Sequence, residues 1–162
     1  MNKKILIYNS GGGLGDSIQL FNVILSLQNH FEQHDFYYLG AHNNHFNNKL
    51  KEFNIRLKTL ELDLKFFGFR WWHLFKVKGK IIEKKIDNFD LVIDLQTKIR
   101  NTLILKQIPC DNFFSSTYNF FFCTRKKKYI NKKDNFLLDV LSNIEIFFET
   151  KIERINFNLN SL

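Results

Sequence analysis

The residues best suited to chemistry follow the first apolar segment of the chain, Ile5-Leu6-Ile7-Tyr8. A loop comes directly after this segment and supplies five candidate ligand-binding residues: Ser10, Gly11, Gly12, Gly13 and Gly15. Glycines let a backbone approach a ligand closely, and the amides that open a following helix can hold an anion. Asp16 stands at the start of that expected helix. A carboxylate there can act as a general base toward a hydroxyl, although it is also a common stabiliser of the helix dipole.

Several phosphate-binding motifs compete for this loop. A P-loop ends in Gly-Lys-Ser/Thr, but here Gly15 is followed by Asp16. The dinucleotide fingerprint would place its last glycine at Asp16, and no acidic residue ends the second strand near Gly40. The loop is one residue away from the DxGxGxG pattern of S-adenosylmethionine methyltransferases, with Asn9 in place of the leading acid. Binding of S-adenosylmethionine therefore stays open as an alternative.

Apolar periodicity predicts which segments position these residues. Continuous or alternating apolar runs predict strands at 4–9, 36–39, 55–60, 90–95, 112–115 and 120–123. Helical spacing predicts helices at 14–30, 42–53, 97–108 and 136–148, with another that ends near residue 86. Strands that alternate with helices predict an α/β fold, a Rossmann-like parallel sheet with helices on both faces. The short loops and the one proline favour a single domain over residues 1–162.

Composition and net charge indicate which classes of partner this chain could bind. The chain is 44% hydrophobic and 25% charged, which is typical of a globular domain, and its formal net charge is +8. That excess favours an anionic partner, although an AT-rich genome would also enrich lysine. The aromatic and basic segment around Trp71-Trp72 fits nucleic acid or anionic lipid, yet we expect at least one of these tryptophans in the core. The lysines at 126–128 are expected in a solvated loop that could seat phosphates.

Cysteine and histidine spacing does not predict a metal site. Cys110 and Cys123 form no CxxC pair, and His30 and His34 do not form HExxH. The basic start lacks the longer apolar region of a signal peptide, and no apolar run approaches the length of a membrane span. We therefore expect a cytoplasmic protein with reduced thiols, whose membrane contact, if any, is peripheral.

Two segments in this order resemble the N-terminal domain of glycosyltransferase family nine, the lipopolysaccharide heptosyltransferases. The first is Leu14-Gly15-Asp16-Ser17-Ile18, between a strand and an amphipathic helix. The second is the segment 89–96, FDLVIDLQ, followed by Arg100, which is similar to the family's YDLVIDLQG strand. Weaker matches are a basic, Trp-containing segment at Arg70 and a basic stretch at Arg125. Thr97 replaces the family's usual glycine, and the triple glycine departs from its more common Ser-rich loop.

The resemblance implies a GT-B enzyme whose N-terminal domain holds the acceptor and whose C-terminal domain holds a nucleotide-sugar. Asp16 would deprotonate an acceptor hydroxyl in an inverting transfer, without a metal or a bound cofactor. The remaining substrate-binding candidates are Arg70, Asp94, Gln96, Arg100 and Arg125, whose guanidinium groups match phosphates or carboxylates.

The resemblance also implies that the donor-binding domain is absent from this chain, which ends at Leu162. We therefore expect no transfer by the chain alone. The expected partners are an anionic glycolipid or glycan acceptor and a nucleotide-sugar, at the inner face of the inner membrane, and nucleic acid is not expected. The alternative is a non-catalytic α/β module that binds anionic glycolipid.

Overall fold

The computed structural model describes residues 3–10, 14–40, 44–47, 50, 53, 55–64, 69–130 and 136–156, without the side chains of Asp16 and residues 136–138. Its elements, in chain order, are β1 Lys3–Asn9, α1 Leu14–His30, β2 His34–Gly40, the 3-10 helix η1 His45–Asn47, β3 Lys58–Thr59, α2 His73–Glu83, β4 Phe89–Asp94, α3 Ile99–Leu105, β5 Cys110–Ser115, α4 Thr117–Phe120 and α5 Phe136–Phe148. Strands and helices alternate along most of this order, which is the pattern of a parallel α/β sheet.

The five strands form one sheet in the order β3-β2-β1-β4-β5, and every neighbouring pair is parallel. At the carboxyl end of the central strand β1, Asn9 pairs with Gly40 of β2 and Tyr8 pairs with Asp94 of β4. The chain first builds outward from β1 through β2 and β3, then returns to place β4 on the other side of β1. Open α/β sheets bind ligands at such a switch point, outside the carboxyl ends of the strands.

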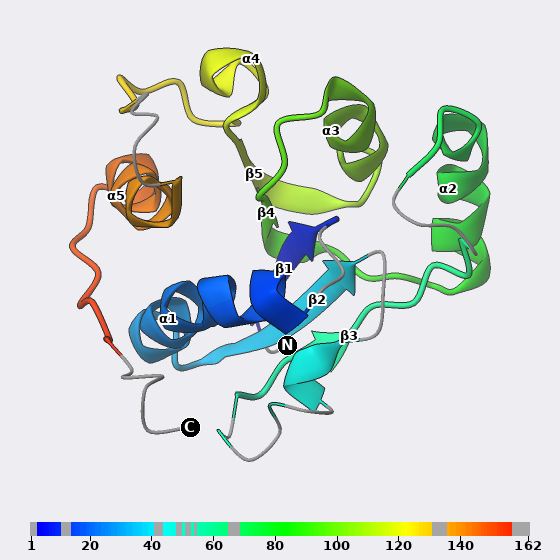
Figure 1. Ribbon diagram of the computed structural model, residues 1–162. Helices are drawn as coiled ribbons and strands as arrows, with labels where there is room; N and C mark the ends of the chain where they lie inside the picture. The colour runs from blue at the N-terminus through cyan, green and yellow to red at the C-terminus, as the bar shows by residue number, and fades with distance from the viewer. Residues whose placement is uncertain are drawn as a thin grey trace.

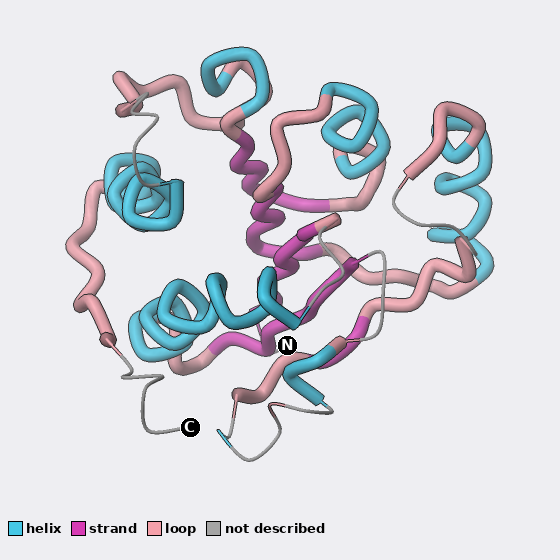
Figure 2. The backbone as a smooth tube through the Cα atoms, viewed as in Figure 1, coloured by secondary structure: helices cyan, strands magenta, loops and turns pink. Residues whose placement is uncertain are grey.

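Helices cover both faces of the sheet, as predicted, and each face has its own core (Figures 1 and 2). Ile5 and Ile7 of β1 belong to the core beneath α1 and α5. The alternate residues Leu6 and Tyr8 belong to the core beneath α2 and α3. This alternation follows from the strand geometry, in which successive side chains point to opposite faces. The fold is thus a Rossmann-like three-layer sandwich centred on β1.

The elements with the clearest apolar periodicity form as predicted. Strand β1 and strand β4 are the two continuous apolar runs, and both are buried on two faces. Helix α1 covers the range predicted from its periodicity, with Phe21 in the core and Leu14, Ile18 and Leu25 packed against it. Helix α5 also begins and ends as predicted. In these segments, local pattern and tertiary packing favour the same structure.

Two predictions between β2 and α2 are wrong in extent. The helix predicted at 42–53 is, in the described residues, the short 3-10 helix η1 followed by a turn at Leu50. The strand predicted at 55–60 contracts to Lys58–Thr59, the edge of the sheet. In this part of the chain, buried side chains rather than helical or strand hydrogen bonds hold the backbone in place. Asn44 donates from Nδ2 to the Leu57 carbonyl at 2.8 Å, and Phe46 is fully buried.

The strand predicted at 120–123 does not form. Phe120 instead ends α4, where three successive residues have positive φ, a backbone incompatible with a strand: Tyr118, Asn119 and Phe120. The apolar run splits, because Phe120 and Cys123 are buried whereas Phe121 is 69% exposed. The Phe120 ring stacks on Tyr129 at 4.5 Å between centroids. A strand was therefore the wrong interpretation of an apolar turn.

The tryptophan pair also departs from expectation. Trp71 and Trp72 lie in a turn just before α2, and they are 53% and 48% exposed, so neither is a core residue. In the described residues no helix has both the length and the apolar character needed to cross a membrane.

Candidate functional site

The candidate site lies at the carboxyl ends of β1 and β4, where the strand order reverses. Ser10 follows β1 directly, and Leu95 extends the pairing by donating its N–H to the Tyr8 carbonyl at 3.1 Å. This bond brings the next residue, Gln96, beside the end of β1. Helices α2, α3 and α4 begin at this same end of the sheet (Figure 1). The predicted glycines 11–13 lie outside the described residues.

A buried carboxylate organises the base of this site. Asp94 ends β4 and is 1% exposed. Its Oδ2 accepts hydrogen bonds from the hydroxyls of Thr102 in α3, at 2.6 Å, and Ser115 in β5, at 2.9 Å. Its Oδ1 accepts the backbone N–H of Gln96 at 2.9 Å. Asp94 therefore ties β4 to α3, to β5 and to the loop that follows it.

Burial also changes the acidity of this carboxyl group. Removal from water raises the pKa of Asp94 to about 6, while the hydrogen bonds from Thr102, the Gln96 backbone and Ser115 act in the opposite direction. No cation pairs with Asp94 among the described residues. A carboxyl group held by hydroxyls and an amide in this way is suited to orienting its neighbours.

Gln96 is the residue that this network positions. Its N–H is held by Asp94, and its carbonyl accepts the hydroxyl of Thr117 at 3.1 Å. Thr117 is itself tied to the network, with its Oγ1 at 2.7 Å from that of Thr102. The Gln96 side chain then reaches across the switch point and donates from Nε2 to Asn9 Oδ1 at 2.8 Å. The amide pair of Gln96 and Asn9 thus bridges the ends of β1 and β4, next to the glycine loop.

Asp16 lies in the first turn of α1, three residues after Gly13. Its side chain lies outside the described part of the structure, so its role as a base stays a prediction. Gly15, immediately before it, is exposed, and a Cβ built there would meet no other atom within 4 Å. The packing of the described residues therefore leaves open space beside the backbone at Gly15.

Three of the predicted residues influence the acidity of the buried Tyr8 phenol. Burial and the Asp94 carboxylate raise the pKa of the Tyr8 phenol, whereas Ser10 and Arg100 lower it. These effects require the groups to be close together in space. Arg100 lies in the first turn of α3 with its Nε buried, and it has no hydrogen-bond partner or ion pair among the described residues. Arg100 therefore brings an uncompensated positive charge to the site.

Further positively charged side chains lie near the start of α2. The Phe69 ring stacks on Tyr8 at 5.0 Å between centroids and contacts the ring of His73, the first residue of α2. Burial lowers the pKa of His73, and the nearby cations Lys76, Arg100 and Arg70 lower it further. The Arg70 backbone N–H donates to His73 Nδ1 at 3.0 Å, which a neutral imidazole accepts. The exposed Arg70 side chain is thus held on the same side as Arg100.

Arg125 is not brought into this cluster. Its guanidinium donates to Asn112 of β5 and to the Phe147 carbonyl, at 3.3 and 3.2 Å. It also lies over the rings of Phe147 and Phe148, with centroid distances of 5.3 and 5.0 Å. These contacts hold the end of α5 against the sheet. Arg125 therefore has a structural role that its place in a basic stretch did not reveal.

Sequence reasoning missed the residues that support the site. Tyr8, His73, Thr102, Ser115 and Thr117 were not singled out, because their contacts with Asp94, Gln96 and the neighbouring cations appear only in the folded chain. One signal was available for two of them, since Ser115 ends strand β5 and Thr117 comes two residues later, at the same edge of the sheet as Asp94. The arrangement joins amides, hydroxyls and free guanidinium groups, which can bind a polyhydroxylated anion. Among the described residues no cluster of His, Cys, Asp and Glu could hold a metal ion.

The fold is similar to that of a known enzyme. The sequence matches no protein family model and no curated protein. The structure superposes on a crystal structure of the glycosyl transferase family 9 protein from Veillonella parvula DSM 2008, with a TM-score of 0.60 over 97% of this chain. The sequence identity is 16%, so the likeness is one of fold. The chain spans 46% of the length of that protein.

Proposed function

We propose that this chain is the acceptor-binding half of a glycosyltransferase that resembles family nine. The observation that carries the proposal is the hydrogen-bonded set of Asp94, Gln96 and Asn9 at the switch point, where Ser10 and Arg100 also act on Tyr8, beside the helix whose first turn contains Asp16. The likeness of nearly the whole chain to a glycosyl transferase family 9 structure supports the same conclusion. The Leu-Gly-Asp and Asp-Leu-Gln segments that carry the sequence resemblance also flank this point.

In this proposal Asp16 is the general base. It takes the proton from one hydroxyl of the acceptor sugar, and that oxygen attacks the anomeric carbon of the activated sugar. The bond from the anomeric carbon to the nucleoside diphosphate breaks, and the configuration at that carbon inverts. The first turn of a helix favours the ionised form of a carboxylate, which is the form that a base requires.

Arg70 and Arg100 bind the anionic groups of the acceptor. Guanidinium groups match phosphate and carboxylate oxygens bidentately, and both side chains lack a protein counter-ion in the described residues. Gln96 and Asn9 orient sugar hydroxyls through their amides, and Asp94 acts by holding Gln96. Arg125 takes no part in binding here, because its guanidinium is engaged with α5.

The nucleotide-sugar is expected to bind a second, donor-binding half supplied in the same or another chain, which would close over the carboxyl ends of the strands. The glycine loop would then face the acceptor or the donor phosphate. A glycolipid acceptor such as a lipopolysaccharide core would place the reaction at the cytoplasmic face of the inner membrane.

The test begins with the coding sequence beyond the Leu162 codon. A donor-binding half found there would be expressed with this chain, and transfer would be followed by release of nucleoside diphosphate from a panel of nucleotide-sugars. Asp16→Asn should abolish transfer and leave acceptor binding intact. The matched control is Asp87→Asn, which removes an exposed carboxylate before β4. Equal transfer by the wild-type protein and the Asp16 variant would show that Asp16 is not the base.

A second candidate function is a non-catalytic module that binds anionic glycolipid. The feature that favours it is the pair Arg70 and Arg100, neither of which has a counter-ion among the described residues. Titration calorimetry with a phosphorylated lipopolysaccharide core tests binding by this chain directly. Binding that Arg100→Gln weakens, without a donor half beyond Leu162, would favour the module. An absence of binding would count against both functions.

A further inference from the structure

The outer side of α2 carries an apolar surface that the core does not use. His73, Val77 and Ile81 are the buried residues of this helix and face the sheet. Phe75 and Ile82 are 85% and 69% exposed, and Trp71 and Trp72 precede the helix with about half of their surfaces in water. Helical spacing places Trp71, Phe75 and Ile82 on one side, opposite the buried residues. We call these four exposed residues the α2 outer surface.

Positive charge flanks this surface. Lys76 and Lys78 lie on the exposed part of α2, and neither forms an ion pair in the described residues. The exposed Arg70 stands directly before Trp71. The two lysines toward the end of the helix differ, because Lys80 pairs with Glu83 and Lys84 pairs with Asp63. The uncompensated cations are therefore gathered around the aromatic residues at the start of α2.

We propose that the α2 outer surface docks on an anionic phospholipid bilayer. Aromatic side chains that stand among lysine and arginine are suited to the boundary between lipid headgroups and acyl chains. Each basic residue near an anionic surface adds attraction that falls off within a Debye length. Gly79 is exposed between Phe75 and Ile82, and a Cβ built there would meet nothing within 4 Å, so the helix is open at this position.

A bilayer fits this surface better than a protein partner does. A protein partner would require fixed counter-charges opposite several mobile lysines, whereas anionic headgroups can rearrange to meet them. The chain as a whole carries a formal net charge of +8, which adds attraction toward the same surface. The inference does not depend on the proposed catalytic function. It would place Arg70 and the start of α2, at the edge of the candidate site, next to the membrane.

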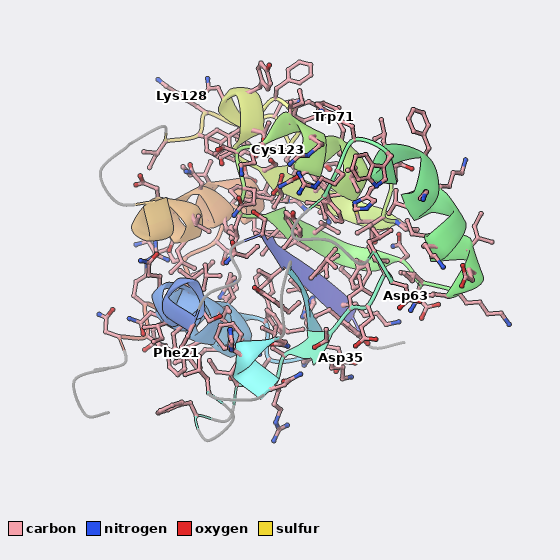
Figure 3. All side chains as sticks on the ribbon, turned by 45° about the vertical axis from the view of Figure 1, so that its right-hand side comes forward. Phe21, Asp35, Asp63, Trp71, Cys123 and Lys128 are labelled. Atoms are coloured by element: carbon pink, nitrogen blue, oxygen red, sulfur yellow. The ribbon has the colours of Figure 1, made fainter. Side chains whose placement is uncertain are left out.

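The chain offers a direct probe of this docking. Its two tryptophans are the only ones in the sequence, and both belong to the α2 outer surface. Figure 3 labels Trp71, on the segment that leads into α2. Tryptophan emission shifts to shorter wavelength when the ring leaves water, so the intrinsic fluorescence of the wild-type protein reports on this surface alone. Vesicles of equal parts phosphatidylglycerol and phosphatidylcholine serve as the target, and pure phosphatidylcholine vesicles serve as the control.

We expect a blue shift and co-sedimentation with the anionic vesicles, both reversed by high salt and absent with phosphatidylcholine alone. Phe75→Ser with Ile82→Ser should weaken binding roughly tenfold or more, because burial of two large apolar side chains is lost. Lys76→Gln with Lys78→Gln should also weaken it, by roughly tenfold at low salt. Both pairs are exposed, so the fold should be retained. The charge control is Lys151→Gln, an exposed lysine beyond α5.

Three results would overturn the inference. The first is an absence of binding to anionic vesicles by the wild-type protein. The second is equal binding by the Phe75/Ile82 variant and the wild-type protein. The third is a dimer, seen by sedimentation, that the Phe75/Ile82 variant disrupts and that does not bind vesicles. In that case a second copy of the chain covers the surface. Normal transfer by Asp16→Asn would refute the proposed base and leave this inference untouched, so the two proposals fail separately.

Discussion

Asp94→Asn tests whether burial raises the pKa of this carboxyl group in the folded protein. The ordinary pKa of 3.8 rises to about 6 in the folded protein, so the folded state favours the protonated form. A raised pKa contributes stability that is present below the unfolded value and lost as the pH rises through the folded value. A shift of about two units corresponds to about 3 kcal/mol. The wild-type protein should therefore lose about 3 kcal/mol through this group between pH 4 and pH 7.

The asparagine variant has no such loss, because its amide does not titrate. Its Oδ1 still accepts the Gln96 N–H, and its Nδ2 takes the place of the oxygen that faces Thr102 and Ser115. Both hydroxyls can rotate to accept, since Thr102 can donate to the Lys98 carbonyl and Ser115 can donate to Thr117. The variant should thus gain about 3 kcal/mol relative to the wild-type protein as the pH rises from 4 to 7.

Urea unfolding at a series of pH values measures this difference, by linear extrapolation at each pH. The control is Asp111→Asn, an exposed carboxylate in β5, which reports the effect of removing a surface charge. Titration of other groups, such as His73, is common to both proteins and cancels in the difference. Parallel stability curves for the wild-type protein and the Asp94 variant would refute the reasoning. So would a variant that loses stability relative to the wild-type protein as the pH rises.

Two further predictions concern residues around the site. The pKa of His73 is lowered in the fold, so its contribution to stability is present above its ordinary pKa of 6.5 and lost on acidification below it. His73→Gln should remove this loss of stability at acid pH, measured by the same urea unfolding curves. An equal loss of stability at acid pH in the variant and the wild-type protein would show that His73 is not its cause. Arg125→Ala should lower stability by about 1–3 kcal/mol, because it loses its hydrogen bond to Phe147 and its contacts with two aromatic rings. The Arg125→Ala variant should bind a phosphorylated core sugar as the wild-type protein does in calorimetry. Weaker binding by the variant would show that Arg125 contributes to acceptor binding.

The parts of the fold that the sequence predicted correctly are those with strong local periodicity. The run from Ile5 to Tyr8 fits a strand buried on both faces, and the apolar residues of α1 recur at helical spacing. Segments with weaker periodicity were less predictable. In the run from Phe120 to Phe122, consecutive aromatic residues indicate burial but do not distinguish a strand from a turn. The structure has a turn, with a positive φ at Phe120.

The candidate site was partly visible in the sequence. Asp94 ends a buried strand and Gln96 follows it by two residues, so a parallel sheet brings both to the same edge as the loop after β1. Their partners were not visible, since Gln96 and Asn9 are 87 positions apart and Asp94 bonds to Ser115 21 positions away. Arg70, Arg100 and Arg125 looked alike in the sequence. Among the described residues, packing left the first two without counter-ions and engaged the third with α5.

The sequence by itself determined the main alternation of strands and helices, the parallel sheet that such an alternation implies, and the edge at which the candidate residues gather. Each of these depends on local apolar spacing, which a short stretch of chain contains in full. Only the tertiary structure decided the burial that raises the pKa of Asp94, the bridge between Gln96 and Asn9, and the exposure of Trp71 and Trp72. Burial and hydrogen-bond pairing depend on which distant segments meet, and no short stretch of chain contains that information.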